Sequence, residues 1–232
     1  MERTIRQWDF LIALFTELVA QPVPGWLINR DNWKKRLDGV EIGEEDMKVI
    51  VMNFLVVEGY VEVAETFRLA TGTNPDIDIG RVADRMAVKT ALQNGDVQAA
   101  IEKLNDMDPE ILGTNRQLFF RVQLQRLIEL IRNRNTEEAL ACAKEVLAPI
   151  AEEHRNFLPV LEKTVALLAF EDPSNCPFEG EVLDISLRSS IATIVNAAIL
   201  KSQNLDKVSA LQYLVKMWIW AQTNCELEDS DI

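Results

Sequence analysis

Glycine, proline, cysteine and histidine are all scarce in this chain of 232 residues. The 9 glycines and 8 prolines together number 17, whereas average usage would place roughly 28 in a chain of this length. So few turn-forming residues favour long helices with short connections over a sandwich or barrel of many strands. The single histidine, His154, and the three cysteines, Cys142, Cys176 and Cys225, do not have the spacing of a zinc site or a redox motif. This odd cysteine number favours a reducing compartment, and we expect a cytoplasmic and nuclear protein.

Basic residues are also scarce relative to acidic ones: the chain has 24 Lys and Arg but 37 Asp and Glu, so its net charge is −13. Such a surface repels phosphate backbones and anionic lipids, so we expect no nucleic acid and no membrane among the partners. The apolar stretch near the N-terminus, residues 10–15, spans six residues, whereas a membrane-spanning helix needs about 20. We expect an amphipathic helix or a partly ordered extension there rather than a targeting peptide.

Apolar residues recur at spacings of three and four, which is the pattern of helices. Between Glu44 and Glu58 the residues of one such face are Met47, Ile50, Val51, Phe54 and Leu55. Gly59 ends this helix, and a second one is expected over residues 60–70, so the two form a helical hairpin.

Helix start and stop signals continue downstream. Asp78 and Asp96 are expected caps, and Thr114 with Gln117 reads as a capping box. Thr136 is the expected cap of a helix that should end near Pro149. The helices expected beyond the hairpin cover residues 79–94, 97–104, 115–133, 136–147, 156–170, 182–202 and 205–224. No segment shows a convincing run of strict alternation, so the predicted fold class is all-α.

Catalytic and cofactor signatures are missing from this pattern. No glycine-rich phosphate loop can be written, and no set of His and Cys residues fits a metal, so we expect neither cofactor nor metal. Cys142 falls inside an expected helix beside apolar residues, which favours a core thiol over a nucleophile. A thioester-forming enzyme using Cys142 or Cys225 would lack a partnering histidine. The residues alone therefore predict a helical interaction module that is not an enzyme.

The hairpin resembles a known motif. Residues 47–67 are similar to the LisH motif, in which an apolar helix is followed by Gly-Tyr or Gly-Phe and then by Ala-x-x-Phe. The residues at these places are Leu55, Gly59, Tyr60, Ala64 and Phe67. Residues 81–101 and 115–132 resemble a CTLH domain, and residues 167–173 and 195–199 resemble the CRA region.

This order identifies the chain as a member of the LisH–CTLH–CRA family. The resemblance implies a LisH helical hairpin followed by a CTLH–CRA helical bundle. The expected segments are a variable N-terminal extension (1–27), an N-terminal helix with its connection (28–45), LisH (46–77), CTLH (78–135), CRA (136–225) and an acidic tail (226–232). The RING-like zinc module and the SPRY domain that other members append have no counterpart here.

Without those modules the chain resembles the small scaffold subunits of GID/CTLH E3 ubiquitin ligases. The resemblance implies a non-catalytic assembly subunit that links RING-bearing and substrate-receptor subunits through LisH and CTLH–CRA helical interfaces. The implied partners, in a homo- or hetero-oligomer, are RING-bearing and SPRY-bearing relatives and an armadillo-type scaffold subunit. The alternative is a LisH-type dimerisation adaptor in cytoskeletal or nuclear transport regulation. Trp218 and Trp220 lie two positions apart on a helix, so they point to different faces and one could reach a partner. The expected protein-interaction residues are Ile50, Leu55, Gly59, Tyr60, Ala64, Phe67, Trp218 and Trp220.

Overall fold

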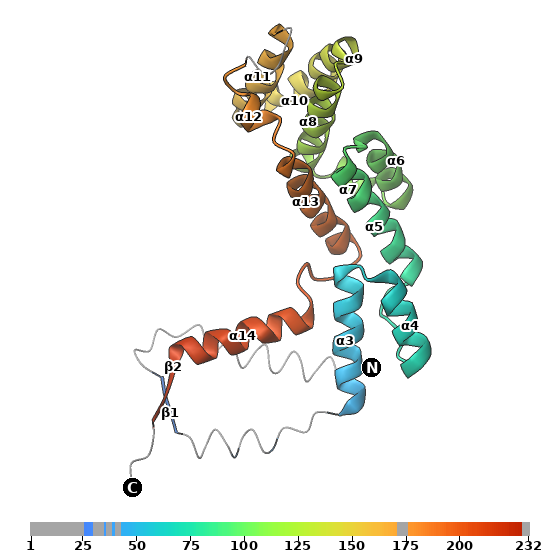
Figure 1. Ribbon diagram of the computed structural model, residues 1–232, viewed down its shortest axis with the longest axis vertical. Helices are drawn as coiled ribbons and strands as arrows, with labels where there is room; N and C mark the ends of the chain where they lie inside the picture. The colour runs from blue at the N-terminus through green and yellow to red at the C-terminus, as the bar shows by residue number, and fades with distance from the viewer. Residues whose placement is uncertain (1–25, 30–34, 36–38, 40–42, 171–175, 229–232) are drawn as a thin grey trace. The chain divides into compact units, whose positions relative to one another are not determined.

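The computed structural model describes residues 26–29, 35, 39, 43–170 and 176–228 (Figure 1). They divide into two compact units. The hairpin unit contains the described residues up to Asp76 and those from Val208 onward, and the bundle unit runs from Ile77 to Lys207. Helices dominate both units, which confirms the all-α prediction. Most of the extension (1–27) and most of the segment expected to hold the N-terminal helix and its connection (28–45) lie outside the described residues.

The hairpin unit contains three helices, α3 (Glu44–Glu58), α4 (Val61–Thr71) and α14 (Ala210–Asn224). Three acidic residues open α3, where they complement the helix dipole, and the carboxylate of Asp46 accepts a hydrogen bond from the backbone N–H of Gly43 at 3.1 Å. Gly59 ends α3 in the left-handed region at φ 87°, which glycine adopts without strain. Its N–H donates back to the carbonyls of Leu55 and Val56, so the chain turns within two residues into α4.

Two short strands complete the hairpin unit, and the sequence did not predict them. β1 (Trp26–Asn29) and β2 (Cys225–Glu228) pair in parallel, with Trp26 opposite Cys225 and Asn29 opposite Glu228. Each strand has only four residues, too few for an alternation pattern to be recognised. Their partners also come from opposite ends of the chain, and a local sequence pattern carries no information about such a pairing.

The bundle unit is built from helices and short helical turns. Its elements are α5 (Ile79–Asn94), α6 (Val97–Met107), α7 (Glu110–Gly113), α8 (Arg116–Arg132), α9 (Thr136–Ala141), η1 (Cys142–Leu147), α10 (Ala148–Glu153), η2 (Arg155–Phe157), α11 (Leu158–Ala166), η3 (Leu167–Ala169), α12 (Glu179–Val182) and α13 (Ser186–Ser202).

Helix α8 contributes to two hydrophobic clusters. Leu118 and Val122 pack into a cluster with residues of α5, α6, α7 and α13. Leu127 and Ile131 belong to a second cluster, which contains residues of α9 to α11 and the buried thiols Cys142 and Cys176. Because both clusters include α8, this helix joins the two halves of the bundle unit.

Three predicted helix signals in the bundle unit are wrong. Thr136 is the first residue of α9, and the N-cap position before it is held by Asn135. The start of α8 is capped by Asn115, whose Oδ1 accepts from the N–H of Leu118 at 3.0 Å, rather than by Thr114. The Thr114 hydroxyl instead donates to the carbonyl of Glu110. The helix from Thr136 does not end near Pro149 but continues to Glu153, and a π-helical stretch, η1, directly precedes the proline-containing α10. Such a wider turn relieves the clash between a proline ring and the preceding carbonyls.

Residues 179–202 are long and apolar enough, by composition alone, to cross a membrane. In the structure they contain α13, which packs against α5 and α8 and places Ile191, Val195 and Ile199 in the first cluster. Another side of α13 carries Asn196, whose Oδ1 accepts from the buried guanidinium of Arg85 at 2.6 Å. These contacts are those of a core helix in a folded bundle.

A buried ion pair joins α8 to α13. The carboxylate of Glu129 accepts hydrogen bonds from Nε of Arg188 at 2.8 Å and from Nη2 of Arg188 at 2.6 Å. It also accepts a hydrogen bond from Nε2 of Gln125 at 2.8 Å. Nε of Arg132 lies 3.3 Å away. The Arg188 guanidinium also faces the α5–α6 turn, where a Cβ at Gly95 would lie 2.6 Å from Nη2. A glycine is therefore needed there both for space and for its φ of +84°.

Replacing Glu129 by Gln should lower the free energy of unfolding by about 3 kcal/mol at pH 7, because Arg188 loses its counter-charge. Burial alone would raise the pKa of Glu129, but hydrogen bonds from Arg188 and Gln125 and the charges of Arg188 and Arg132 hold it below its usual value. The stabilisation is therefore complete above the unfolded pKa of about 4.3 and is lost as the pH falls through the lower folded pKa. Urea unfolding should show a difference between the parent and Glu129→Gln that shrinks below about pH 4.

The matched control for this substitution is Glu181→Gln. Glu181 forms an ion pair with Lys163 at 2.9 Å, and its side chain is 65% exposed. Its loss should cost less than about 1 kcal/mol. Equal urea midpoints for Glu129→Gln and the parent at pH 7 would show that the buried pair contributes nothing to stability.

Candidate protein interaction surface

Helix α14 is fastened to α3 by polar contacts. The backbone N–H of Ala210, at the start of α14, donates to Oδ1 of Asn53 on α3 at 2.9 Å. A second hydrogen bond joins the same two helices, in which Nε2 of Gln212 on α14 donates to Oε1 of Glu58 on α3 at 2.6 Å. The side chain of Asn53 therefore acts as a cap for a helix that begins 157 residues later in the chain. These contacts bring the C-terminal helix onto the hairpin.

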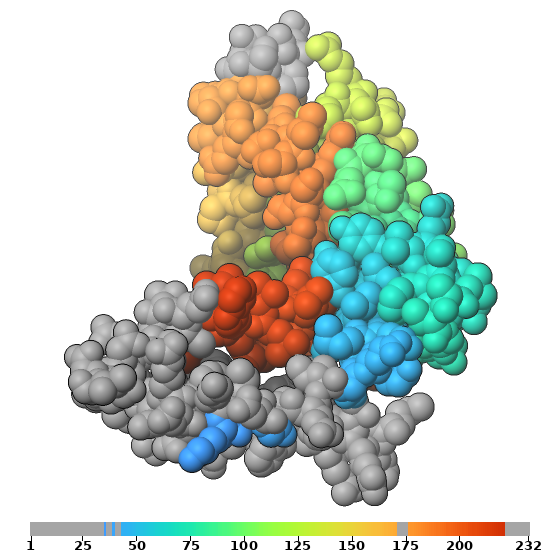
Figure 2. All heavy atoms as spheres, turned by 60° about the horizontal axis from the view of Figure 1, so that its bottom comes forward, coloured from blue at the N-terminus to red at the C-terminus, as the bar shows by residue number. Residues whose placement is uncertain are grey.

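The hairpin unit exposes many large apolar side chains. Of the 16 that are exposed among the described residues, 11 belong to this unit, five on or beside α3 and α4 and six on α14. We call these 11 the hairpin surface: Met47, Val49, Tyr60, Val63, Leu69, Leu211, Tyr213, Val215, Trp218, Ile219 and Trp220. Figure 2 shows α14, in orange-red, beside α3, in blue, on one face of this unit.

This surface has the composition of a protein-binding site. Trp218 is 63% exposed and Tyr60 is 52% exposed, although each presents a large apolar ring to water. Tryptophan and tyrosine are the residues that most often dominate binding energy at protein interfaces, and clustered apolar exposure marks interaction sites. The hairpin surface is therefore the best candidate functional site in the described part of the chain.

Comparison with known proteins agrees with this architecture. Residues 81–226 match the CTLH family, described as the CTLH/CRA C-terminal to LisH motif domain. "Protein GID8 homolog" of Arabidopsis thaliana is 57% identical over 200 residues, which cover 86% of this chain and 82% of that protein. "Glucose-induced degradation protein 8 homolog" of Dictyostelium discoideum is 46% identical over 86% of this chain and 87% of its own length. "GID complex subunit 8" of Schizosaccharomyces pombe is 33% identical over 87% of this chain and 88% of its own length.

This chain belongs to the GID8 family. The resemblance inferred from the LisH, CTLH and CRA segments is thereby confirmed. The CTLH match extends from α5 to β2, so in this GID8-family chain the matched region includes the whole bundle unit apart from its first residues and also α14 of the hairpin unit.

The structure assigns different positions to the eight predicted interaction residues of this GID8-family chain. Ile50, Leu55 and Ala64 are buried, so they shape the hairpin from inside. Gly59 forms the turn between α3 and α4, and Phe67 is half-buried. The residues that lie on the hairpin surface are Tyr60, Trp218 and Trp220. That these side chains contact a partner remains a prediction.

Sequence reasoning missed the polar residues that hold α14 in place. Asn53 and Glu58 lie within the first hairpin helix, and neither belongs to its predicted apolar face. The signal available was one of composition: Asn53 is a polar, half-buried residue within an otherwise apolar stretch from Val49 to Val57. Its hydrogen-bonding partner could not be found from the sequence, because nothing local points to residue 210.

The groups considered for catalysis lie elsewhere. Cys142 is buried in the bundle unit, which confirms the core thiol prediction, and burial raises the pKa of this thiol. His154 is exposed at the end of α10, with its ring edge-on to Phe157 at 5.7 Å. Among the described residues, no three Asp, Glu, His or Cys side chains gather in a way that could hold a metal.

Replacing Asn53 by Ala should loosen α14 without unfolding the bundle unit. Removing a side-chain cap costs typically about 1 kcal/mol, which corresponds to a roughly fivefold larger population of the opened helix and so to roughly fivefold faster amide exchange. Hydrogen exchange followed by mass spectrometry should show this acceleration in peptides covering residues 210–220 and no change in those covering α8. The variant Asn53→Asp keeps an oxygen acceptor and should retain most of the protection. Unchanged exchange of α14 in Asn53→Ala would rule out the capping role.

Proposed function

We propose that this protein is a non-catalytic scaffold subunit of a GID/CTLH-type E3 ubiquitin ligase. It links RING-bearing and SPRY-bearing LisH–CTLH–CRA relatives and an armadillo-type scaffold subunit through helical surfaces. The observation that carries the proposal is the hairpin surface, a concentration of exposed Trp, Tyr and aliphatic side chains, in a chain that shares 57% identity with a GID8 homolog. The name of the Schizosaccharomyces pombe relative, GID complex subunit 8, supports membership of such a complex.

The hairpin surface fits this role physically. Two short helices joined by a tight turn cannot cover their own apolar side chains, and α14 covers only part of them while adding more of its own. A partner that buries Tyr60 and Trp218 would remove two of the most exposed aromatic rings from water. In this proposal the subunit works in the cytoplasm and nucleus, and the free thiols Cys142 and Cys176 are compatible with those reducing compartments.

The double substitution Tyr60→Ala, Trp218→Ala should weaken binding to a purified RING-bearing LisH–CTLH–CRA relative. If these rings are interface hot spots, their loss costs at least about 2 kcal/mol, a roughly thirtyfold rise in Kd measured by calorimetry. Circular dichroism should show an unchanged helix content, because both side chains are exposed in the free protein.

The control for this experiment is Glu62→Ala, which removes an exposed polar side chain from α4. Glu58→Ala is unsuitable, because Glu58 accepts a hydrogen bond from Gln212 and helps to hold α14. Full binding by the folded double variant would contradict an interface at the hairpin surface. Co-purification with cytoskeletal or transport proteins and without a RING-bearing relative would instead favour the dimerisation adaptor.

The proposal also makes a statement about activity. With E1, E2 and ubiquitin, the pure chain should form no ubiquitin chains, because one His and three Cys cannot supply the eight ligands of a RING-like zinc module. Adding the RING-bearing relative should start chain formation. Gel analysis of both reactions is the measurement, and chain formation by the isolated protein would refute the non-catalytic assignment.

A further inference from the structure

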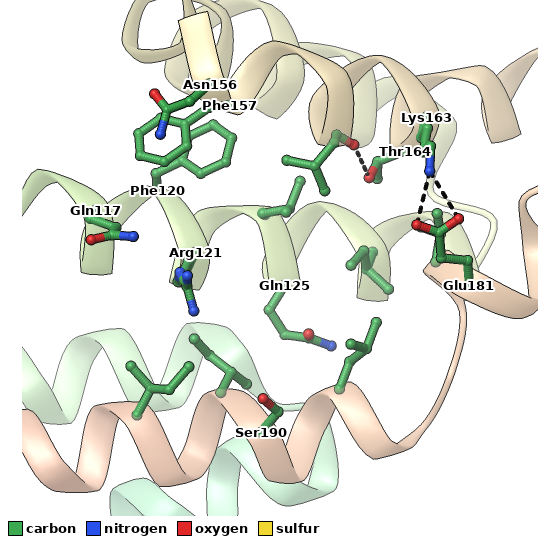
Figure 3. Close-up of a pocket in the computed structure, with 17 residues that line it drawn as sticks. Gln117, Phe120, Arg121, Gln125, Asn156, Phe157, Lys163, Thr164, Glu181 and Ser190 are labelled. Carbon is green, nitrogen blue, oxygen red and sulfur yellow. Dashed lines mark hydrogen bonds and ion pairs between the residues drawn. The ribbon is translucent and has the colours of Figure 1, made fainter. Parts of the chain in front are cut away.

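The bundle unit has a groove of about 470 Å³ that the proposed function does not use (Figure 3). Helix α8 forms its floor, and α11 and α13 form its two walls. The stacked rings of Phe120 and Phe157, 4.2 Å apart, lie towards one end, and the ion pair between Lys163 and Glu181 lies towards the other. The volume falls within the range of about 300–1,000 Å³ that is usual for ligand-binding clefts.

The charge of this groove is opposite to that of the protein. Its charged lining residues are Arg121, Lys163 and Glu181, a net charge of +1, whereas the whole chain carries −13. Lys163 donates to both oxygens of Glu181 at 2.9 Å, so the one lining carboxylate is already neutralised. Arg121 is exposed and forms no ion pair with any described residue. An acidic group is therefore the complement of this groove.

Polar side chains extend along the floor beside Arg121. Gln117 and Gln125 lie one helical turn before and one after it on α8, and Figure 3 shows the three side chains in a row. Nε2 of Gln125 already donates to Glu129, so Arg121 and Gln117 are the groups considered for an occupant. The apolar lining on either side is formed by Leu124 and Ile128 of α8, Val160 of α11, and Leu187, Ile191 and Ile194 of α13. Val160 is 39% exposed, so part of this apolar surface faces water. The occupant must therefore carry an apolar stripe next to a carboxylate.

The shape selects a helix as that occupant. A groove whose floor and both walls are helices can receive a further helix by ordinary helix packing, and amphipathic helices commonly bind in such grooves. Among the described helices, α14 exposes the most large apolar side chains, but it does not fit, because residues 210–224 contain Lys216 and no Asp or Glu. Its charge would oppose Arg121, which disfavours a second copy docked through that helix.

We propose that the α8–α11–α13 groove binds an acidic amphipathic helix of another protein. The apolar stripe of that helix lies between α11 and α13, and one of its carboxylates meets Arg121. This inference deepens the scaffold proposal, on which it rests for the existence of partner proteins, by stating which kind of helix one groove of the CTLH–CRA bundle binds. The hairpin surface and the groove lie in different units, so the two proposals can fail independently.

Fluorescence anisotropy with the full chain tests the charge preference. The probes are two fluorescein-labelled helical peptides of about 20 residues with the same Leu stripe, one with a Glu-rich and one with a Lys-rich polar face. The parent should bind the Glu peptide more tightly, by about fivefold if one exposed ion pair decides. Arg121→Glu should reverse this preference, and Arg121→Gln should abolish it. Arg116→Glu, an exposed charge reversal on α8 outside the groove, should leave it unchanged.

A steric pair of variants tests the location. Ser190 and Ser189 are both exposed neighbours on α13, but only Ser190 lines the groove. Ser190→Trp should therefore reduce binding of the Glu peptide at least tenfold, whereas Ser189→Trp should not. Circular dichroism establishes that both variants are folded.

Several results would overturn the groove proposal. They are the absence of binding by either peptide, a preference for the Glu peptide that survives Arg121→Glu, and equal effects of the two Ser→Trp variants. A parent dimer in light scattering that Ser190→Trp converts to a monomer would identify a second copy as the occupant, which also contradicts it. None of these outcomes touches the scaffold proposal, which fails if the RING-bearing relative does not bind or if the isolated protein forms ubiquitin chains. Its binding to Ser190→Trp should stay unchanged when the hairpin surface is the contact.

Discussion

A hairpin of two short helices cannot build a core from its own side chains, and this constraint governs the hairpin unit. Helices α3 and α4 together hold 26 residues. Helix α14 supplies the missing third helix by packing against α3. Asn53 and Glu58 of α3 accept hydrogen bonds from Ala210 and Gln212 in the first turn of α14. The helix that completes the hairpin also carries six exposed apolar side chains, so the element needed for folding is also the element proposed to bind.

The bundle unit follows a different principle, because two apolar clusters give it a core without outside help. Its polar interior has a positioning role: Glu129 and Arg188 fix α13 against α8, and Gly95 leaves room for the guanidinium. A buried ion pair of this kind contributes through specific geometry, since a shifted helix would leave a charge unpaired. The groove on α8 depends on that geometry, because α13 forms one of its walls.

Local sequence signals predicted most helices well and long-range contacts poorly. The apolar period and Gly59 located α3 and α4, and Asn94-Gly95 located the end of α5 within one residue. The capping box predicted from Thr114 and Gln117 is wrong by one residue, because Asn115 can cap as well and only the structure shows that its side chain turns towards the helix. For the site, the tryptophan spacing predicted that one of the two rings could reach a partner, whereas the structure exposes both rings and buries Leu55 and Ile50. The role of Asn53 depends on a residue 157 positions away, and no window on the sequence contains both.

The order of the elements along the chain has a consequence for synthesis. Because ribosomes produce the N-terminus first, α3 and α4 emerge long before α14, and the entire bundle unit lies between them. The bundle unit can fold around its own two clusters during translation, but the hairpin unit cannot be completed before α14 has been synthesised. A nascent chain that has not reached α14 lacks Trp218 and the rest of the α14 face, so it does not yet present the whole surface proposed to bind a partner. The hairpin surface therefore depends on two segments of the chain that are separated by 157 residues.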